Sequence, residues 1–279
     1  MSTSSFSNSL FTISETGDLS LLGLHFDNLN PSSTNALMSI TSSDNTQQAN
    51  ITIIDCEFNQ DSSSYSSSSS SSSLSHSIIS INGGQMRYGA AFNAQLQSGN
   101  QLKINNSEFI QCNGSSNGEC KASEQGGGIR VNIYDANCQL TLEDGVKFED
   151  CISNYIGGGM HIYIYEQGTS IINKVQFKDC KAYFGGGVAQ GASGQTKQIF
   201  NGIQFHNCEA LISGGGMEDS LHGENSILEL IDVIFENCTS GSQGGGLNII
   251  IYEGQFITQG ACSVMNCSSD CRQSRNNRS

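Results

Sequence analysis

The sequence contains a single proline, Pro31, no tryptophan, and only 12 Lys and Arg residues among 279. Proline cannot donate a hydrogen bond to a strand ladder, so a chain almost free of proline can be built of strands throughout. Asp and Glu number 26, which gives a formal net charge of −14. Because nucleic acids and anionic membranes are themselves negative, we expect neither as a partner.

Long apolar runs are also missing. No stretch approaches the length of a transmembrane helix, and residues 1–20 contain neither the basic segment nor the apolar core of a signal peptide. We therefore expect no membrane span and no signal peptide within this chain. The first recognisable repeat begins near Leu19 without a capping helix, so we expect the chain to be part of a longer protein.

The sequence does contain a repeat of about 29 residues. One copy, residues 174–188, reads KVQFKDCKAYFGGGV; its hallmarks are Phe-x-Asp/Asn-Cys, then three glycines and an aliphatic residue. The motif phenylalanines recur every 28–30 residues, at Phe148, Phe177, Phe205 and Phe235. The glycine triplets begin at Gly126, Gly157, Gly185, Gly214 and Gly244. A period that tolerates slips of one residue is typical of a stacked repeat.

Apolar residues recur upstream of each motif phenylalanine, as Leu19, Leu21 and Leu24 do before Phe26. Alternation at i and i+2 is typical of a half-buried strand. The second and third apolar positions are three residues apart, as Leu21 and Leu24 are, and this wider spacing indicates a bend. The residue just before the third apolar position is, in most repeats, one that tolerates a left-handed backbone. This column comprises Gly23, Asp55, Asn106, Gly145, Lys174, Gly202, Asp232 and Ala261.

A strand-rich unit of this length cannot bury its apolar face alone, so the units are expected to stack roughly 4.8 Å apart around a continuous core. The eight Phe-type positions from Phe26 to Val264 predict an all-β parallel β-helix, a solenoid of about eight rungs. Its core ladders are expected to be Phe109, Phe148, Phe177, Phe205 and Phe235, and Cys112, Cys151, Cys180, Cys208, Cys238 and Cys267.

We expect one domain over residues 1–271 and a frayed tail at 272–279. The serine-rich stretch 62–77 is expected to be a disordered loop projecting from one rung. Gly89, Ala90 and Ala91 are expected to fill the glycine slot of that same rung. One long rung would then explain the 51-residue step from Phe58 to Phe109.

The motif Phe-x-Asn/Asp-Cys with Gly-Gly-Gly-aliphatic, clearest between Phe109 and Cys267, resembles the repeats of the polymorphic outer-membrane-protein family. It also resembles the right-handed parallel β-helix proteins of the pectate-lyase-like superfamily, including repeat-rich surface proteins of protists. The resemblance implies a right-handed β-helix at the cell surface or outside the cell. It further implies an adhesive role, with glycans or surface proteins as partners.

The glycine triplets do not predict a phosphate site, because a P-loop requires Lys-Ser/Thr and a following helix, and each triplet here leads into a strand.

The 11 cysteines include no Cys-x-x-Cys pair. Cys56 and Cys262 share a column with aliphatic residues, which predicts small buried hydrophobic side chains, and we extend this interpretation to the ladder cysteines. Cys120, Cys138 and Cys271 lie outside the columns and are the better candidates for pairing. We expect no cofactor and no metal site.

Asp150 and Asp179 carry the alternative, catalytic interpretation. They follow the motif phenylalanines of adjacent rungs and would lie roughly 5 Å apart, the carboxylate separation of retaining glycosidases. Enzymes with the resembled fold cleave acidic polysaccharides with aspartates, or with calcium and a basic residue. In later rungs the column holds Asn207, Asn237 and Asn266, so a polar turn ladder explains it without catalysis. The question of an enzyme stays open, with the non-catalytic interpretation favoured.

Three strands that follow glycine triplets end in Tyr and an acid, at 134–135, 165–166 and 252–253. The tyrosine set Tyr134, Tyr163, Tyr165 and Tyr252 therefore contains candidates for stacking on sugar rings. Strand-end tyrosines also serve to cover a sheet edge, which is the structural alternative.

Charged side chains at equivalent positions, such as Glu149 with Lys178 and His206 with Glu236, are expected to pair between rungs. Asn113 lies in a polar insertion and is the candidate glycosylation site. The favoured function is a non-catalytic surface or structural module that binds glycans or proteins. The alternative is a polysaccharide lyase or glycoside hydrolase on the same scaffold.

Overall fold

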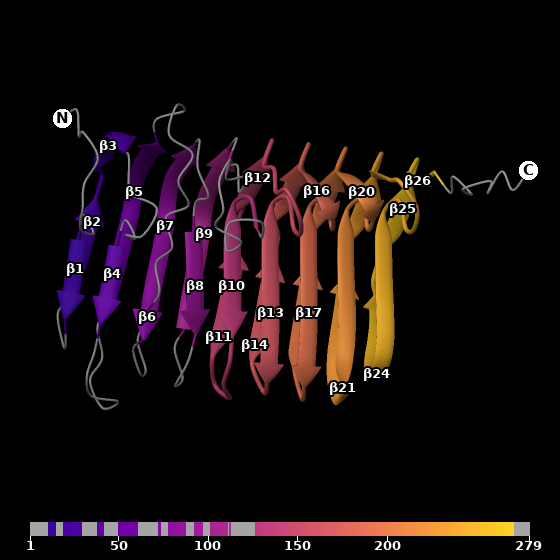
Figure 1. Cartoon of the computed structure of the whole chain (residues 1–279). Coiled ribbons are helices and arrows are strands. Elements are labelled where there is room, and N and C mark those ends of the chain that lie inside the picture. Colours follow the sequence, from indigo (N-terminus) through magenta and orange to yellow (C-terminus); the bar gives the residue numbers. More distant parts are fainter. Residues whose placement is uncertain are drawn as a thin grey trace, which may run out of the picture.

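The computed structural model is a solenoid of strands whose turns follow one another along a single axis, from the N-terminal strands at one end to β26 at the other (Figure 1). It describes residues 11–14, 19–29, 38–41, 50–60, 72–73, 78–87, 92–96, 101–110, 112 and 126–270. Strands of neighbouring turns pair in parallel throughout, and these residues contain no helix. The prediction of an all-β parallel solenoid is confirmed.

Successive turns contribute equivalent strands to four ladders. The first contains β8 (Phe92–Leu96), β10 (Ile129–Ile133), β13 (Met160–Glu166), β17 (Val188–Gly194) and the first parts of β21 (Met217–Ile231) and β24 (Leu247–Gln259). The second contains β2 (Leu19–Leu22), β5 (Asn50–Gln60), β7 (Ile78–Arg87), β9 (Gln101–Ile110), β11 (Gln139–Glu143), β14 (Thr169–Asn173), β18 (Lys197–Asn201) and the second parts of β21 and β24.

The third ladder contains β3 (His25–Leu29), the ends of β5, β7 and β9, and then β12 (Lys147–Glu149), β15 (Gln176–Lys178), β19 (Gln204–His206), β22 (Ile234–Glu236) and β25 (Ser263–Met265). The fourth contains β16 (Lys181–Phe184), β20 (Glu209–Ser213), β23 (Thr239–Ser240) and β26 (Ser268–Ser269). Three further strands, β1 (Phe11–Ser14), β4 (Met38–Thr41) and β6 (Ser72–Ser73), form a separate sheet.

The number of turns differs from the prediction. Where the described chain is continuous, from 126 to 270, the five glycine triplets mark about five turns, against the eight expected of the whole chain. Before that, Met86 pairs with both Phe58 and Phe109, so β7 supplies a separate strand where one long rung was expected. A methionine in the phenylalanine column concealed this strand from the sequence pattern.

Four other expectations fall largely outside the described residues. Within the serine-rich stretch 62–77, only Ser72–Ser73 are described, as strand β6 paired with β4. Gly89, Ala90 and Ala91, the tail from 271 onward and Asn113 are not among the described residues.

The predicted phenylalanine ladder forms the centre of the core. Rings of adjacent turns lie 4.8–5.0 Å apart with interplanar angles of 2–11°, and each side chain is at most 2% exposed. Because the parallel ladder places identical residues directly above one another, the rings stack at the rung spacing. The stack runs through Phe109, Phe148, Phe177, Phe205 and Phe235.

Each glycine of a triplet has its own reason to be glycine, as Gly185, Gly186 and Gly187 illustrate. Gly185 has a φ of 61°, in the left-handed region. A Cβ on Gly186 would lie 2.2 Å from the carbonyl oxygen of Gly215 in the next turn. A Cβ on Gly187 would lie 2.7 Å from Cδ1 of Phe205. The triplet therefore turns the chain, brings two turns together and makes room for the next ring.

The predicted bend column also adopts the left-handed conformation, including at Lys174, with φ of 52°. In the last turn the left-handed residue is Gly260 and not the expected Ala261, because this turn has one extra residue between Gln259 and Ser263. The other members with positive φ are Gly23, Asn106, Gly145, Gly202 and Asp232.

Replacing Phe177 with Ala should lower the free energy of unfolding by about 3–5 kcal/mol, because it leaves a cavity between two stacked rings. Leu211, which is 58% exposed, provides the control, and its replacement with Ala should cost less than about 0.5 kcal/mol. Urea denaturation followed by circular dichroism measures both. A loss of under about 1 kcal/mol for Phe177→Ala would contradict the ladder as the core.

Candidate functional site

The aspartate pair of the catalytic alternative lies in a structural turn. Asp150 and Asp179 have φ of 53° and 54° and stand where the chain bends from the third ladder into the fourth. The equivalent residues of the following turns have the same left-handed φ, and all are asparagine: Asn207, Asn237 and Asn266. Asp and Asn are the non-glycine residues that adopt this conformation most readily, so the backbone accounts for the column.

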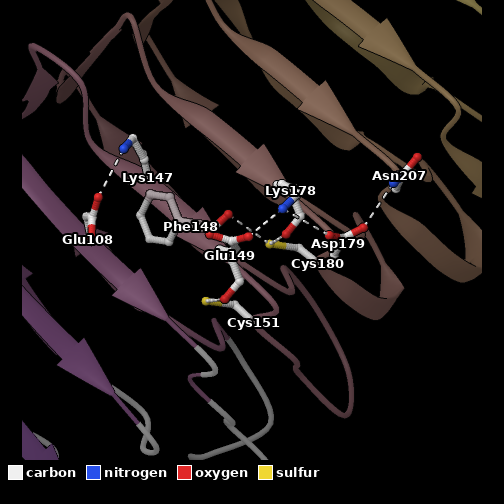
Figure 2. Close-up of polar contacts among 9 residues, drawn as sticks. All are labelled: Glu108, Lys147, Phe148, Glu149, Cys151, Lys178, Asp179, Cys180 and Asn207. Atoms are coloured by element: carbon white, nitrogen blue, oxygen red, sulfur yellow. Dashed lines mark hydrogen bonds and ion pairs between the residues drawn. The ribbon is translucent and has the colours of Figure 1, made fainter.

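Hydrogen bonds between rungs occupy these turn residues. Asn207 Nδ2 donates to Asp179 Oδ1 over 3.1 Å, and Lys178 Nζ lies 3.7 Å from Asp179 Oδ2 (Figure 2). Lys178 also donates to Glu149 over 2.5 Å, and this hydrogen bond raises the pKa of the lysine. Lys178, which lies beside Asp179, is thus engaged in an ion pair with Glu149, which favours a structural role for the aspartates.

The predicted pairing of charges between rungs is observed. Glu149 and Lys178 are in register and form the ion pair described above, and Nδ1 of His206 lies 3.2 Å from Glu236 Oε2. Lys147 forms an equivalent contact with Glu108 over 3.0 Å (Figure 2). These side chains are partly exposed, and ion pairs at such positions contribute little to stability. Their main effect is to place opposite charges next to each other on adjacent turns.

The cysteine ladder is a column of thiols that is buried from Cys112 to Cys238 and partly exposed at Cys267. The Sγ atoms of Cys151, Cys180 and Cys208 donate to the carbonyl of the phenylalanine one turn earlier over 3.3–3.6 Å. Burial raises the pKa of all three thiols well above the usual range. The hydrogen bond with Cys208, followed by burial, raises the pKa of Cys238 as well. Neutral thiols are poor nucleophiles and poor metal ligands, so this column has a packing role.

The remaining cysteines divide differently from the prediction. Cys262 lies in the last described turn and is exposed, although Val175, Ile203 and Val233 of the same column are buried. Cys138 is 1% exposed and packs in the core. Cys120 and Cys271, and the side chain of Cys56, lie outside the described residues, so their pairing stays a prediction.

The tyrosines form two groups on one edge of the solenoid, where the first ladder turns into the second. Tyr134 and Tyr165 stack with centroids 5.0 Å apart and an interplanar angle of 6°, and Tyr163 leans on Tyr165 at 4.4 Å. Tyr252 stacks on His222 with centroids 4.3 Å apart. The structure thus brings together three of the four predicted tyrosines, and the fourth, Tyr252, stacks on a histidine.

A single non-aromatic position separates the two groups. Tyr165 pairs with Ser193 of the next turn. In the turn after that, Leu221 pairs with Ala192, so His222 follows Leu221 just as Ser193 follows Ala192. The outward column therefore reads Tyr134, Tyr165, Ser193, His222 from turn to turn, and Tyr252 closes it through its ring contact. We call this column the ring ledge. Tyr165 and His222 stand two rungs apart, roughly 10 Å, and Ser193 holds the position of the column between them.

A shallow pocket of about 480 Å³ opens beside the ledge. It is lined by Tyr134, Asp135, Tyr165, Glu166, Ser193 and Gly194. Burial raises the pKa of Tyr165, with the neighbouring tyrosines acting in the same direction, so its phenol is protonated and can donate a hydrogen bond. Aromatic faces beside carboxylates and a hydroxyl are a combination suited to a polyhydroxylated ligand.

Sequence reasoning missed Ser193 and His222, because only tyrosines were compared between turns. Aligning the residues that follow each glycine triplet places both in the tyrosine column. The same alignment reveals His161, which is 6% exposed on the first ladder. Burial lowers the pKa of His161 to about 3, and the nearby charge of Arg130 acts in the same direction, so this imidazole is neutral at neutral pH.

Two kinds of feature are absent from the described part of the chain. No group of three or more His, Cys, Asp or Glu side chains there is placed to hold a metal ion. Nor does any helix in these residues have the length and apolar character needed to cross a membrane. Comparison of the chain with family models, with curated proteins and with solved structures gives no match in any of the three.

Asp179→Asn should leave the free energy of unfolding within about 0.5 kcal/mol, since asparagine adopts the same turn. Asp179→Val should lower it by about 1–2 kcal/mol, because a β-branched residue resists positive φ. Gln176→Val, in the neighbouring strand β15, is the control and should be tolerated. Equal effects of valine at both positions, in urea denaturation, would contradict a backbone role for Asp179.

In the folded protein, iodoacetamide at mildly alkaline pH should alkylate exposed Cys262 and leave Cys180 unmodified. The raised pKa and the burial of Cys180 both slow its reaction. Peptide mass spectrometry after a timed quench measures the two sites in one sample, and the unfolded protein should react at both. Rapid native alkylation of Cys180 would show that the ladder opens or that the thiol is activated.

Proposed function

We propose that this chain is a non-catalytic β-solenoid module that binds carbohydrate at the ring ledge. The observation that carries the proposal is the stack of rings interrupted at Ser193, with the pocket beside it. A sugar ring has an apolar face that packs on aromatic rings and hydroxyls that need hydrogen-bond partners. The ledge offers both, from Tyr165 and from the polar groups of the pocket.

The position at Ser193 has the dimensions of one ring. Adjacent rings of the ledge stack at 4.3–5.0 Å, and the two rings that flank Ser193 are roughly two rungs apart. A ligand ring inserted there would contact Tyr165 on one side and His222 on the other at ordinary stacking distances. An oligosaccharide running along the axis would place its further units over the remaining rings.

The charge of the site points to the class of sugar. Glu166 and Asp135 line the pocket, and the chain carries a formal net charge of −14. Neutral or amino sugars are therefore preferred ligands, and uronic acid polymers are disfavoured by repulsion. This choice also separates the proposal from the polysaccharide lyases of the resembled superfamily, which act on acidic polymers.

A surface or extracellular setting and an adhesive role accompany this proposal. They rest on the resemblance of the repeat to adhesin-type β-helix repeats, and on the suitability of a rigid repeated scaffold for presenting a row of equivalent positions. The alternative, a lyase or glycoside hydrolase acting through Asp150 and Asp179, is less favoured. Both aspartates occupy left-handed turn positions that asparagine fills in three other turns.

Tyr165→Ala should weaken carbohydrate retention roughly two- to tenfold, the loss of one aromatic contact. Ser193→Tyr should abolish binding without lowering stability, because a tyrosine there would complete the ring ledge and occupy the ligand position. Tyr183→Ala, on the fourth ladder, is the control and should bind as the wild type does. Affinity electrophoresis against neutral, amino and acidic polysaccharides measures all three.

The same polysaccharide panel decides between binding and cleavage. The proposal predicts retention without new reducing ends or unsaturated products, with or without calcium. Turnover that disappears in Asp150→Asn or Asp179→Asn would establish the enzymatic alternative. Retention that Ser193→Tyr leaves unchanged would place the binding surface elsewhere on the solenoid.

A further inference from the structure

A cluster of polar side chains lies inside the solenoid, where the first and second ladders face each other. All six members are 0–4% exposed, in a core whose buried side chains are mostly apolar. We call it the interior polar cluster: Ser170, Gln190, Thr196, Gln198, Asp219 and Ser226. In the neighbouring turns, the column that holds Gln190 and Asp219 is filled by Val131, Ile162 and Ile249.

Hydrogen bonds connect five of the six residues into one directed chain. Thr196 donates to Ser226 over 3.2 Å, and Gln198 Nε2 donates to Thr196 over 3.4 Å. Gln190 Nε2 in turn donates to Gln198 Oε1 over 2.5 Å and to Ser170 over 3.4 Å. In this arrangement both Nε2 groups are occupied as donors, so neither is available to Asp219.

The chain ends on acceptors that lack a donor. Gln190 Oε1 and both carboxylate oxygens of Asp219 are buried without a hydrogen-bond partner in the described structure. The two residues are directly opposed, since Gln190 of β17 pairs with Asp219 of β21. A buried acceptor without a donor costs about 1–3 kcal/mol, and a buried carboxylate costs more. A proton on Asp219, shared with Gln190, would satisfy an acceptor on each residue.

No cation offers Asp219 an alternative from the described strands around it. On its own strand, Glu218 adds negative charge, and Lys197 of β18 is exposed on the outer surface. Strands β17 and β14 contain no titratable residue, and Glu253 of β24 is exposed. Burial, assisted by Glu218, raises the pKa of Asp219 well above its usual range. The backbone N–H of Ser220 opposes this rise but makes no hydrogen bond of ordinary geometry.

We propose that Asp219 is protonated in the folded protein at neutral pH and donates its O–H to Gln190 Oε1, so that the solenoid is stabilised by acid. The proton completes the hydrogen-bond chain without requiring additional space in the core. The unfolded chain, with an ordinary aspartate pKa of about 3.9, binds the proton more weakly. The stabilisation is therefore full below about pH 4 and is lost as the pH rises through the folded-state pKa.

Asp219→Asn tests this arrangement, because asparagine has the shape of the neutral acid and donates through Nδ2. The variant should melt several degrees above the wild type at mildly alkaline pH, and the difference should disappear towards pH 4, where the unfolded wild type also binds the proton. Asp150→Asn is the control: this exposed aspartate should show no comparable dependence of the difference on pH. Melting curves across the pH range, at constant ionic strength, measure both.

If the variant does not fold, the protonation state of Asp219 can be measured directly in the wild-type protein. The ¹³C chemical shift of the Asp219 carboxyl group should report the protonated form at neutral pH. An ionised Asp219 there, or a variant that melts below the wild type at mildly alkaline pH, would overturn the proposal. Stabilisation of the wild type by sodium, potassium or calcium that Asp219→Asn abolishes would also overturn it, by showing that a cation and not a proton occupies the cluster.

Discussion

Stacking of equivalent residues at the rung spacing is the constraint on which this molecule depends. The rings of the phenylalanine column lie 4.8–5.0 Å apart, close to the distance that backbone hydrogen bonds impose between parallel strands. Ring contact and backbone pairing therefore favour the same register. Any displacement of one turn along the strands would break both, which explains why the register holds at Phe177, Cys180 and Gly187 together.

The same constraint separates structural from functional positions. Where a column is filled by interchangeable residues from turn to turn, as Asp and Asn are after the motif phenylalanine, the backbone conformation accounts for the choice. A column in which the chemical type of the side chain changes from one turn to the next requires another explanation. The ring ledge loses its ring at Ser193, and the interior column becomes polar at Gln190 and Asp219. Ser193 and Asp219 each stand at such an interruption.

Most of the fold could be read from the sequence because a solenoid repeats its constraints. The phenylalanine and cysteine ladders, the bends and the pairing of Glu149 with Lys178 all followed from comparing equivalent positions. The reading was wrong where a turn departed from the pattern, at Met86 and at Gly260. The candidate site was only partly predictable. The tyrosines could be identified as candidates from their residue type alone. Ser193 and Asp219 become candidates only when the residues that surround them in space are known.

The close fit of Gly187 to Phe205 has a consequence for how such a protein can change in length. Each third glycine of a triplet makes room for the next motif phenylalanine along the chain, which lies across the same turn. A gene segment that encodes one complete turn therefore carries one socket and one ring that match each other. Its duplication or loss would leave both junctions matched, and a lineage could lengthen or shorten this solenoid by a whole turn in one genetic event. In the last described turn Val264 takes the place of the ring, and a Cβ on Gly246 would lie 3.1 Å from its nearest neighbours, Phe235 Cβ and Val264 Cγ1.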